Sequence, residues 1–397
     1  MALTAAPSSR TSLGMNPFTF NTTASITFEP GAAKRLGDVA GKRLGRKILF
    51  VTDKGIRAAG LCDGALRSLE AAGAEAVIFD SVEADPSRAT LMSAVEAGRG
   101  ATGVVGFGGG SSLDVAKLAA LLLGSGEDLD AAWGVGQAKG PRLPLVLVPT
   151  TAGTGSEVTP VSIITVGEEE KRGVSSPVLL PDAAVLDPEL TLSLPPHITA
   201  ATGIDAMVHA IEAYASKNAN NNPLSKMLAR QALRLLGANI ERAVFSGHDI
   251  EARSGMLLGS MLAGQAFANS PVAAVHALAY PIGGTFHVPH GLSNALVLPH
   301  VLRFNAAAAA PLYAEIAADA FPHLAETGMQ GRCAAFIDEL AALASRLEMQ
   351  TQLRQVRIGE ADLPKLAADA MKQQRLLVNN PREVTEADAL AIYRAAL

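Results

Sequence analysis

The sequence predicts an α/β dinucleotide-binding domain with a mostly parallel sheet, followed by an all-α domain. From about residue 18 to 196, short β-branched and apolar runs alternate with helical stretches, which is typical of a parallel sheet covered by helices. After Pro195 and Pro196 these runs disappear and apolar residues recur at helical spacing. We therefore expect an N-terminal α/β domain at 18–196, a helical domain at 197–397 and a flexible tail at 1–17.

Five segments carry the expected strands. Each is apolar almost throughout, and several end in Asp, Gly or Pro, where the chain must turn. Continuous apolar runs of this length indicate strands that are buried on both faces of a sheet. The segments are KILFVTD at 47–53, AEAVIFD at 74–80, GVVGFG at 103–108, LPLVLVP at 143–149 and AAVLD at 183–187.

Composition excludes several classes of protein. The chain has 397 residues, 49% of them hydrophobic, and a net charge of −5 without a long run of Lys or Arg, so we expect no nucleic-acid and no membrane partner. Cys62 and Cys333 stand far apart, which indicates neither a disulfide framework nor a cysteine zinc site and favours the cytoplasm. No apolar stretch reads as long enough to cross a bilayer. The first fourteen residues resemble an unordered tail more than a transit peptide.

A glycine-rich turn predicts a phosphate site. The run Gly108 to Ser112 follows a strand and precedes a helix expected from Leu113 to Leu123. Backbone N–H groups and the positive end of a helix dipole meet at such a turn, so it can bind a pyrophosphate. The pattern is not G-x-G-x-x-G, and a tight turn without a ligand is the alternative interpretation.

Three further features extend the nucleotide site. Asp53 ends the first strand, where a carboxylate can bind a ribose diol and repel a 2′-phosphate, so we expect NAD rather than NADP; a helix cap is the alternative. The segment PTTAGTGSEVT at 149–159 offers hydroxyl and amide donors to a ligand. Lys171 can supply a positive charge to cofactor or substrate, and the alternative is a solvated hairpin charge.

A carboxylate and three histidines predict a metal site. Asp205 and His209 are four residues apart in a helical pattern and so share one helix face. His276 and His290 lie further on in apolar surroundings, although a single histidine there is more often a hydrogen-bonded core residue. Together the four can hold iron or zinc, which polarises a carbonyl oxygen beside nicotinamide. His287 is interpreted as a cleft residue.

Several motifs in order resemble the iron-containing, or group III, alcohol dehydrogenase family. The resemblance runs from about Phe18 to the C-terminus. It implies a metal-dependent oxidoreductase that transfers hydride between NAD(H) and a small alcohol, aldehyde or ketone, and a homodimer or larger assembly. The motifs are GGGSSLDVAK, PTTAGTGSEVT, GIDAMVHAIEAY, HALAYPIGG, FHVPHGLSNALVLPHVLRFN and NNPREVTEAD.

The resemblance also implies roles by position. The metal ligands it implies are Asp205, His209, His276 and His290. The cofactor-binding residues it implies are Asp53, Gly109, Gly110, Ser111, Asp114, Thr150, Thr151, Thr154 and Lys171. The metal it implies is Fe(II), with Zn(II) as the alternative.

One departure from the family concerns proton transfer. Many members carry a further histidine four residues after the third ligand, where this chain has Tyr280. A phenol is a poorer proton relay near neutral pH, since its ordinary pKa is about 10. Tyrosine also occurs there in the hydroxyacid-oxoacid transhydrogenase branch, which is one alternative function; a maleylacetate-type reductase is another. We take Lys171, Tyr280 and Phe267, a pocket wall, as the catalytic candidates.

Overall fold

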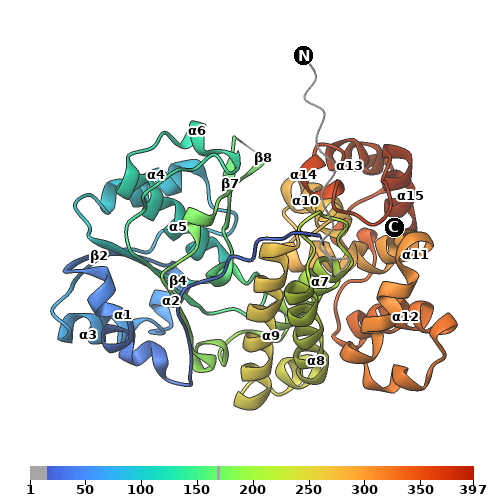
Figure 1. Cartoon of the computed structure of the whole chain (residues 1–397), viewed down its shortest axis with the longest axis horizontal. Helices are drawn as coiled ribbons and strands as arrows, with labels where there is room; N and C mark the ends of the chain where they lie inside the picture. Colours follow the sequence, from blue (N-terminus) through green and yellow to red (C-terminus); the bar gives the residue numbers. More distant parts are fainter. Residues whose placement is uncertain (1–15, 168–169) are drawn as a thin grey trace.

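The structure is a computed structural model that describes residues 16–167 and 170–397. An α/β part and a helical part lie side by side (Figure 1), coloured blue to green and yellow to red. The predicted fold class is confirmed. Residues 1–15 of the expected tail lie outside the described residues, and Asn16 and Pro17 have no regular secondary structure.

A six-stranded, fully parallel sheet forms the centre of the α/β part. Every strand expected from the sequence belongs to it. The expectation that all of them are buried is wrong for β3, because β3 lies at the sheet edge and Ile78 is 38% exposed. Across the sheet the order is β1 (Ile26–Phe28), β9 (Ala183–Leu186), β6 (Leu145–Pro149), β4 (Gly103–Gly108), β2 (Lys47–Val51) and β3 (Glu75–Phe79).

Helices cover both faces of this sheet. Successive residues of β2 point to opposite faces: Ile48 and Phe50 pack under one helix layer, while Leu49 and Val51 pack under the other. Two layers of helix on a parallel sheet bury both faces. The first layer contains η1 (Ala32–Arg35), α1 (Leu36–Leu44) and α3 (Asp63–Ala71), and the second contains α4 (Arg88–Ala97) and α5 (Gly110–Ser125).

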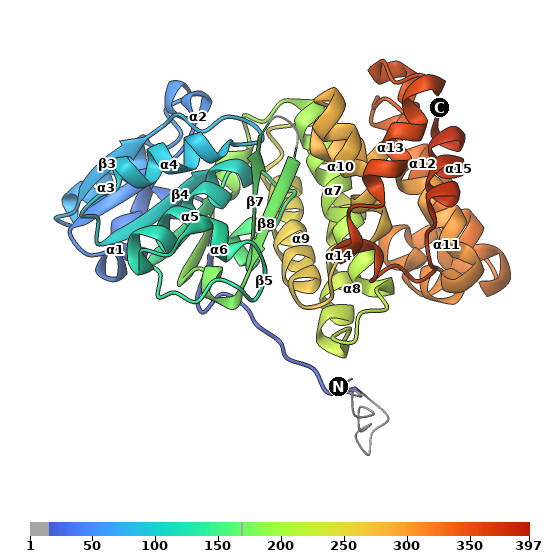
Figure 2. The same ribbon diagram turned by 90° about the horizontal axis from the view of Figure 1, so that it is seen from above.

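A second, three-stranded sheet faces the helical part. Strands β7 (Val161–Val166) and β8 (Glu170–Ser175) are antiparallel, and β5 (Gly134–Val135) pairs in parallel with β8. Figure 2 shows β7 and β8 between the main sheet and the helices. Short connecting elements complete this part: α2 (Lys54–Ala58), α6 (Leu129–Ala132), η2 (Ser156–Val158), η3 (Pro177–Leu179) and η4 (Pro188–Thr191).

The helical part begins at Pro196, the first residue of α7, a position where proline is well tolerated because its missing N–H has no intrahelical partner. We propose residue 196 as the domain boundary. The helices are α7 (Pro196–Ala215), α8 (Pro223–Phe245), α9 (Ile250–Asn269), α10 (Ala274–Phe286), α11 (His290–Ala320), η5 (Pro322–Glu326), α12 (Met329–Arg346), η6 (Leu353–Val356), η7 (Glu360–Asp362), α13 (Leu363–Ala370), α14 (Gln374–Leu377) and α15 (Glu386–Ala396).

The segment before β1 contacts the helical part, although the sequence places it in the α/β range. Thr19 and Asn220 exchange two hydrogen bonds of 2.9 Å, and Asn21 bonds Asn269 at 2.7 and 2.8 Å. In Figures 1 and 2 this dark blue segment crosses from the helices to the sheet. It therefore links the two parts.

Helix α11 corrects the expectation that no stretch is long enough for a membrane. Its 31 residues reach a mean hydropathy of 1.3 over an 18-residue window, and within the described chain it is the helix that passes this test. However, it packs against α7, α8, α10, α12 and α15, and many of its apolar side chains belong to the helical core. Its apolar composition reflects this packing.

Candidate active site

The glycine turn connects β4 to α5 and leaves the start of the helix uncapped. Helix α5 begins at Gly110 rather than at Leu113, and no side chain in the described part of the chain caps its first N–H groups. Gly108 has a φ of 151°, and a Cβ there would lie 2.8 Å from Ser112 Oγ. The turn thus requires glycine at this position, and its free N–H groups can bind a phosphate.

Asp53 faces this turn from the end of β2. Its Oδ1 accepts a hydrogen bond of 2.9 Å from the N–H of Ile56, so it caps α2. Its Oδ2 lies 3.4 Å from the position of a Cβ built on Gly108. The cap, which was the alternative interpretation, uses one oxygen and leaves the other directed at the turn. Since the sheet order reverses between β2 and β4, this is the switch point where parallel sheets bind ligands.

The threonine-rich loop covers the glycine turn. Thr150 follows β6 and donates its N–H to Gly108 O at 2.9 Å. A Cβ on Gly110 would lie 2.8 Å from Thr154 Cγ2, and one on Gly109 would lie 3.5 Å from Thr151 Cγ2. The carboxyl ends of β2, β4 and β6 therefore bring together three of the four expected nucleotide features, and the fourth, Lys171, lies on β8.

Asp114 holds the threonine loop against α5. Its Oδ1 accepts a hydrogen bond of 2.6 Å from Ser156 Oγ, and its Oδ2 accepts one of 2.8 Å from the N–H of Ile163. Burial raises the pKa of Asp114, which Lys117 and these hydrogen bonds oppose. Both carboxylate oxygens already bind protein groups, so the contacts of Asp114 are with the loop and β7.

Three helices bring together the four expected metal ligands. Asp205 and His209 come from α7, His276 from α10 and His290 from the first residue of α11. Ligand atoms of Asp205, His209 and His276 all lie within 4.8 Å of one another, and these three side chains are buried. His290 Nε2 is 3.6 Å from Asp205 Oδ1.

The hydrogen bonds of two imidazoles fit a bound cation. His209 Nδ1 is 3.2 Å from Gly153 O, and His276 Nδ1 is 2.6 Å from Glu212 Oε2. Because both partners are acceptors, each Nδ1 carries the proton and each Nε2 keeps a lone pair. The two Nε2 atoms are 3.0 Å apart, so their lone pairs repel unless a cation lies between them. Three imidazoles and a carboxylate are the donors that iron or zinc takes.

Burial sets the ionisation that metal ligands need. It lowers the pKa of His209 to about 3 and also lowers the pKa of His290. Burial acts to raise the pKa of Asp205, but the three imidazoles and the Asn294 amide outweigh it and hold that pKa below its usual value. At neutral pH His209 and His290 are therefore neutral imidazoles and Asp205 is a carboxylate, the forms that bind metal.

Two of the three catalytic candidates pack against this set, and the third, Lys171, lies on β8. The Phe267 ring stacks on His209 with centroids 4.3 Å apart, and the Tyr280 ring lies 5.8 Å from that of His290. Burial raises the pKa of Tyr280, although Arg375 opposes the shift. Lys171 forms an ion pair with Asp85 and is 15% exposed, so it is not the solvated hairpin charge of the alternative interpretation.

Family models cover almost all of this architecture. One described as iron-containing alcohol dehydrogenase matches residues 23–188, and one described as Fe-containing alcohol dehydrogenase family, C-terminal, matches residues 199–397. The chain belongs to the iron-containing alcohol dehydrogenase family. The α/β part and the helical part thus correspond to the two halves of this family.

Individual relatives agree with this membership. Long-chain-alcohol dehydrogenase 1 of Geobacillus thermodenitrificans is 42% identical over 364 residues, which cover 89% of this chain and 91% of the relative. The crystal structure of a 1,3-propanediol oxidoreductase superposes with a TM-score of 0.92 at 35% identity, covering 96% of this chain and 100% of the other. A sulfoacetaldehyde reductase of Bifidobacterium kashiwanohense, solved with NAD⁺, has a TM-score of 0.83 at 29% identity, covering 96% and 98%.

Two side chains of this family member were not foreseen from its sequence. Glu212 binds the ring of His276 and accepts the N–H of Val275 at 2.7 Å. Asn294 Nδ2 donates to Asp205 Oδ1 at 2.6 Å, and the buried Asn294 Oδ1 has no hydrogen-bond partner among residues 16–167 and 170–397. Helical spacing was the available signal, because Glu212 follows His209 by three residues and Asn294 follows His290 by four.

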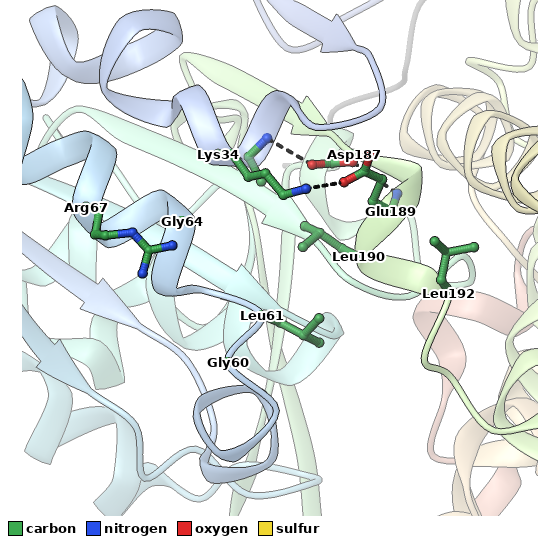
Figure 3. A pocket seen from close by; sticks show the side chains of 10 residues that line it. Lys34, Gly60, Leu61, Gly64, Arg67, Asp187, Glu189, Leu190 and Leu192 are labelled. Carbon is green, nitrogen blue, oxygen red and sulfur yellow. Dashed lines mark hydrogen bonds and ion pairs between the residues drawn. The ribbon is translucent and has the colours of Figure 1, made fainter. Parts of the chain in front are cut away.

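A separate cavity contributes nothing to this site. It measures about 300 Å³ and lies between η1, the start of α3 and η4, where Figure 3 shows Lys34 paired with Glu189 beside Leu190. Lys34 Nζ is 2.6 Å from Glu189 Oε2, and Asp187 accepts the N–H groups of Gly31 and Ala33. Its carboxylates are thus satisfied within the protein.

Proposed function

We propose that this protein is a metal-dependent oxidoreductase that transfers hydride between NAD(H) and a small alcohol and its aldehyde or ketone. The observation that carries the proposal is the Asp205, His209, His276 and His290 cluster beside the loop that also covers the glycine turn. A solved relative holds NAD⁺, and other relatives are named for alcohols and a diol. Fe(II) is the expected metal and Zn(II) the alternative.

The nucleotide half of the proposed mechanism binds and orients the cofactor. Uncapped N–H groups at Gly109, Gly110 and Ser111 bind the pyrophosphate. Asp53 Oδ2 accepts hydrogen bonds from the adenosine ribose and repels a 2′-phosphate. The loop from Thr150 to Thr154 closes over the turn and, through Gly153 O, contacts the ring of His209. Nicotinamide binding therefore takes place next to the metal ligands.

The helical half holds the reacting oxygen. The metal, when bound, supplies a Lewis acid for that oxygen. Glu212 fixes the ring of His276 and raises its basicity as a ligand, while Phe267 packs on His209 and excludes water from that side. Tyr280 occupies the place of the family's further histidine. Since burial raises its pKa, Tyr280 acts as a hydrogen-bond donor and Lys171 supplies positive charge.

Metal removal tests this proposal. The protein is stripped with a chelator, and NADH absorbance is followed anaerobically with short alcohols and aldehydes after Fe(II) or Zn(II) is added back. We expect activity to return with the metal.

A variant of one ligand gives a second test. His276→Ala should lose bound metal, and its activity should fall by roughly a hundredfold or more, because the substitution removes both a ligand nitrogen and the ring that Glu212 orients. The control is His323→Ala, a surface histidine outside the site. Activity that survives complete metal removal contradicts the proposal.

Tyr280 favours a second candidate, a hydroxyacid-oxoacid transhydrogenase in which bound NAD passes hydride between two substrates. Turnover that needs an oxoacid but no free NAD would replace the first proposal with this one. A maleylacetate-type reductase is less favoured because all four metal-ligand candidates are present. A homodimer or larger assembly in the cytoplasm belongs to the same proposal and rests on the family resemblance and on the two isolated cysteines.

A further inference from the structure

Arg375, on α14, reaches the edge of the candidate active site. Its Cζ lies 5.9 Å from the centroid of the Tyr280 ring, within the range of a cation–π contact. The Tyr280 ring is in turn 5.8 Å from the ring of His290. Two successive contacts thus connect this cation to the metal-ligand candidates. None of the proposed steps of hydride transfer uses it.

On its other side the guanidinium faces β8 of the α/β part. A Cβ on Gly173 would lie 3.7 Å from Arg375 Cζ. Gly173 and Lys171 point to the same face of β8, because side chains two residues apart share a strand face. A Cβ at this position would be in ordinary van der Waals contact with the guanidinium, so Arg375 lies directly over this position of β8. Arg375 therefore lies between the two parts of the molecule, on the face of β8 that carries Lys171.

Arg375 differs from Lys171 in its charge partners. Across residues 16–167 and 170–397 it forms no ion pair with a carboxylate, whereas Lys171 is paired with Asp85. Asp114 accepts hydrogen bonds from Ser156 and the backbone with both oxygens. Asp205 belongs to the metal set. Among the described residues, Arg375 thus places a positive charge without a carboxylate partner beside Tyr280.

We propose that Arg375 binds a terminal carboxylate of the substrate, at the end away from the reacting oxygen. This inference rests on the proposed function and narrows its substrate class to short acids that carry an aldehyde or alcohol at the other end. A planar guanidinium binds a carboxylate through two parallel N–H bonds. The Arg375 guanidinium lies over the Tyr280 ring and beside Gly173, and the side chain is exposed, so a carboxylate can reach it.

The test compares acid and neutral aldehydes of matched length with NADH and the metal-loaded protein. The pairs are 4-oxobutanoate with butanal and 5-oxopentanoate with pentanal. The readout is the ratio of kcat/KM for the acid to that for its neutral partner, because loss of the Arg375–Tyr280 contact by itself lowers both values together. The variants are Arg375→Gln, Arg375→Lys and, as the matched control, Arg354→Gln, which removes an exposed arginine on η6.

We expect wild-type protein to prefer at least one acid by about 10- to 100-fold, the range for a hydrogen bond to a charged group. Arg375→Gln should abolish that preference mainly through a higher KM for the acid, Arg375→Lys should keep part of it, and Arg354→Gln should keep all of it. A wild-type ratio near one, or a ratio unchanged in Arg375→Gln, overturns the inference while turnover of neutral aldehydes keeps the proposed function. Absence of turnover with every aldehyde overturns both.

Discussion

At the scale of single residues, the metal ligands could be predicted from the sequence better than the residues that orient them. Asp205, His209, His276 and His290 are conspicuous because histidine and aspartate are expensive in apolar helices, and the structure brings them together. The partners that orient them are ordinary polar residues whose role depends on which helices meet. Asn294 is the clearest case, since only the packing of α11 on α7 places its amide against Asp205.

Asn294 should therefore affect the metal more than the fold. Its Nδ2 lies 2.6 Å from Asp205 Oδ1 and 3.3 Å from His290 Nε2. Asn294→Ala removes a hydrogen bond to a carboxylate, and we expect metal affinity to fall by about 10- to 100-fold, as for other groups that orient metal ligands. Dialysis against graded chelator concentrations, followed by metal analysis, measures this affinity.

Ser293→Ala provides the control for Asn294. Ser293 is also fully buried on α11, but its Oγ bonds the carbonyls of Val288 and Pro289. Thermal unfolding of both metal-free variants reports their effect on the fold. If the two variants retain metal equally well, the role assigned to Asn294 is wrong.

At the scale of elements, hydrophobic pattern identified the central sheet but not the small one. Five parallel strands are apolar runs, so their pattern is strong. Strand β1 has three residues, and β8 carries Glu, Lys and Arg, so neither stands out from a loop. The sequence placed the start of α5 at Leu113 instead of Gly110 for a related reason. Gly110 and Ser111 have low helix propensity, so they do not signal a helix, although the tight turn after β4 places them in its first turn.

Two buried ionisable residues, Lys117 of α5 and Glu157 of η2, lie where α5 packs on the threonine loop. Lys117 is fully buried and donates to Ser156 Oγ at 2.8 Å and to Val161 O at 2.7 Å. Burial lowers the pKa of Lys117 to about 8 and raises that of the buried Glu157 to about 7. Burying ionisable groups costs desolvation free energy, so we expect stability to depend on pH through both residues.

The contribution of Glu157 makes the free energy of unfolding decrease as pH rises. Between the ordinary pKa of 4.5 and about 7, the unfolded chain has lost the proton that the folded chain still holds, so the free energy of unfolding decreases. Glu157→Gln removes this contribution. Its free energy of unfolding relative to wild type should rise between pH 5 and pH 7 by on the order of 2 kcal/mol. Urea unfolding at a series of pH values measures it. The exposed Glu383→Gln should give a flat difference, and a flat difference for Glu157→Gln refutes the argument.

At the scale of the whole molecule, the pattern change near residue 196 indicated two parts, but not how they meet. The contact is made by glycines: a Cβ on Gly264 of α9 would lie 2.9 Å from Gly155 Cα, and one on Gly153 would lie 2.7 Å from Thr202 Cβ. Backbone contacts between remote segments leave no pattern in a sequence. The contacts of Thr19 and Asn21, in the segment before β1, with the helical part leave no such pattern either.

This contact couples the two proposed ligands. One short loop carries Thr154 against Gly110 and Gly153 O against His209 Nδ1, so the nucleotide turn and the metal ligands order the same backbone. Metal should therefore strengthen NADH binding by about 5- to 150-fold, the usual range for coupled sites, and NADH should strengthen metal binding by the same factor. Fluorescence titration of NADH into metal-free and metal-loaded protein measures the first factor, and chelator competition with and without NADH measures the second.

Gly153→Ala, which crowds Thr202, should reduce both factors together, whereas Gly328→Ala, at a site with open space, should change neither. Equal NADH affinity with and without metal would show that the loop holds its position independently of His209.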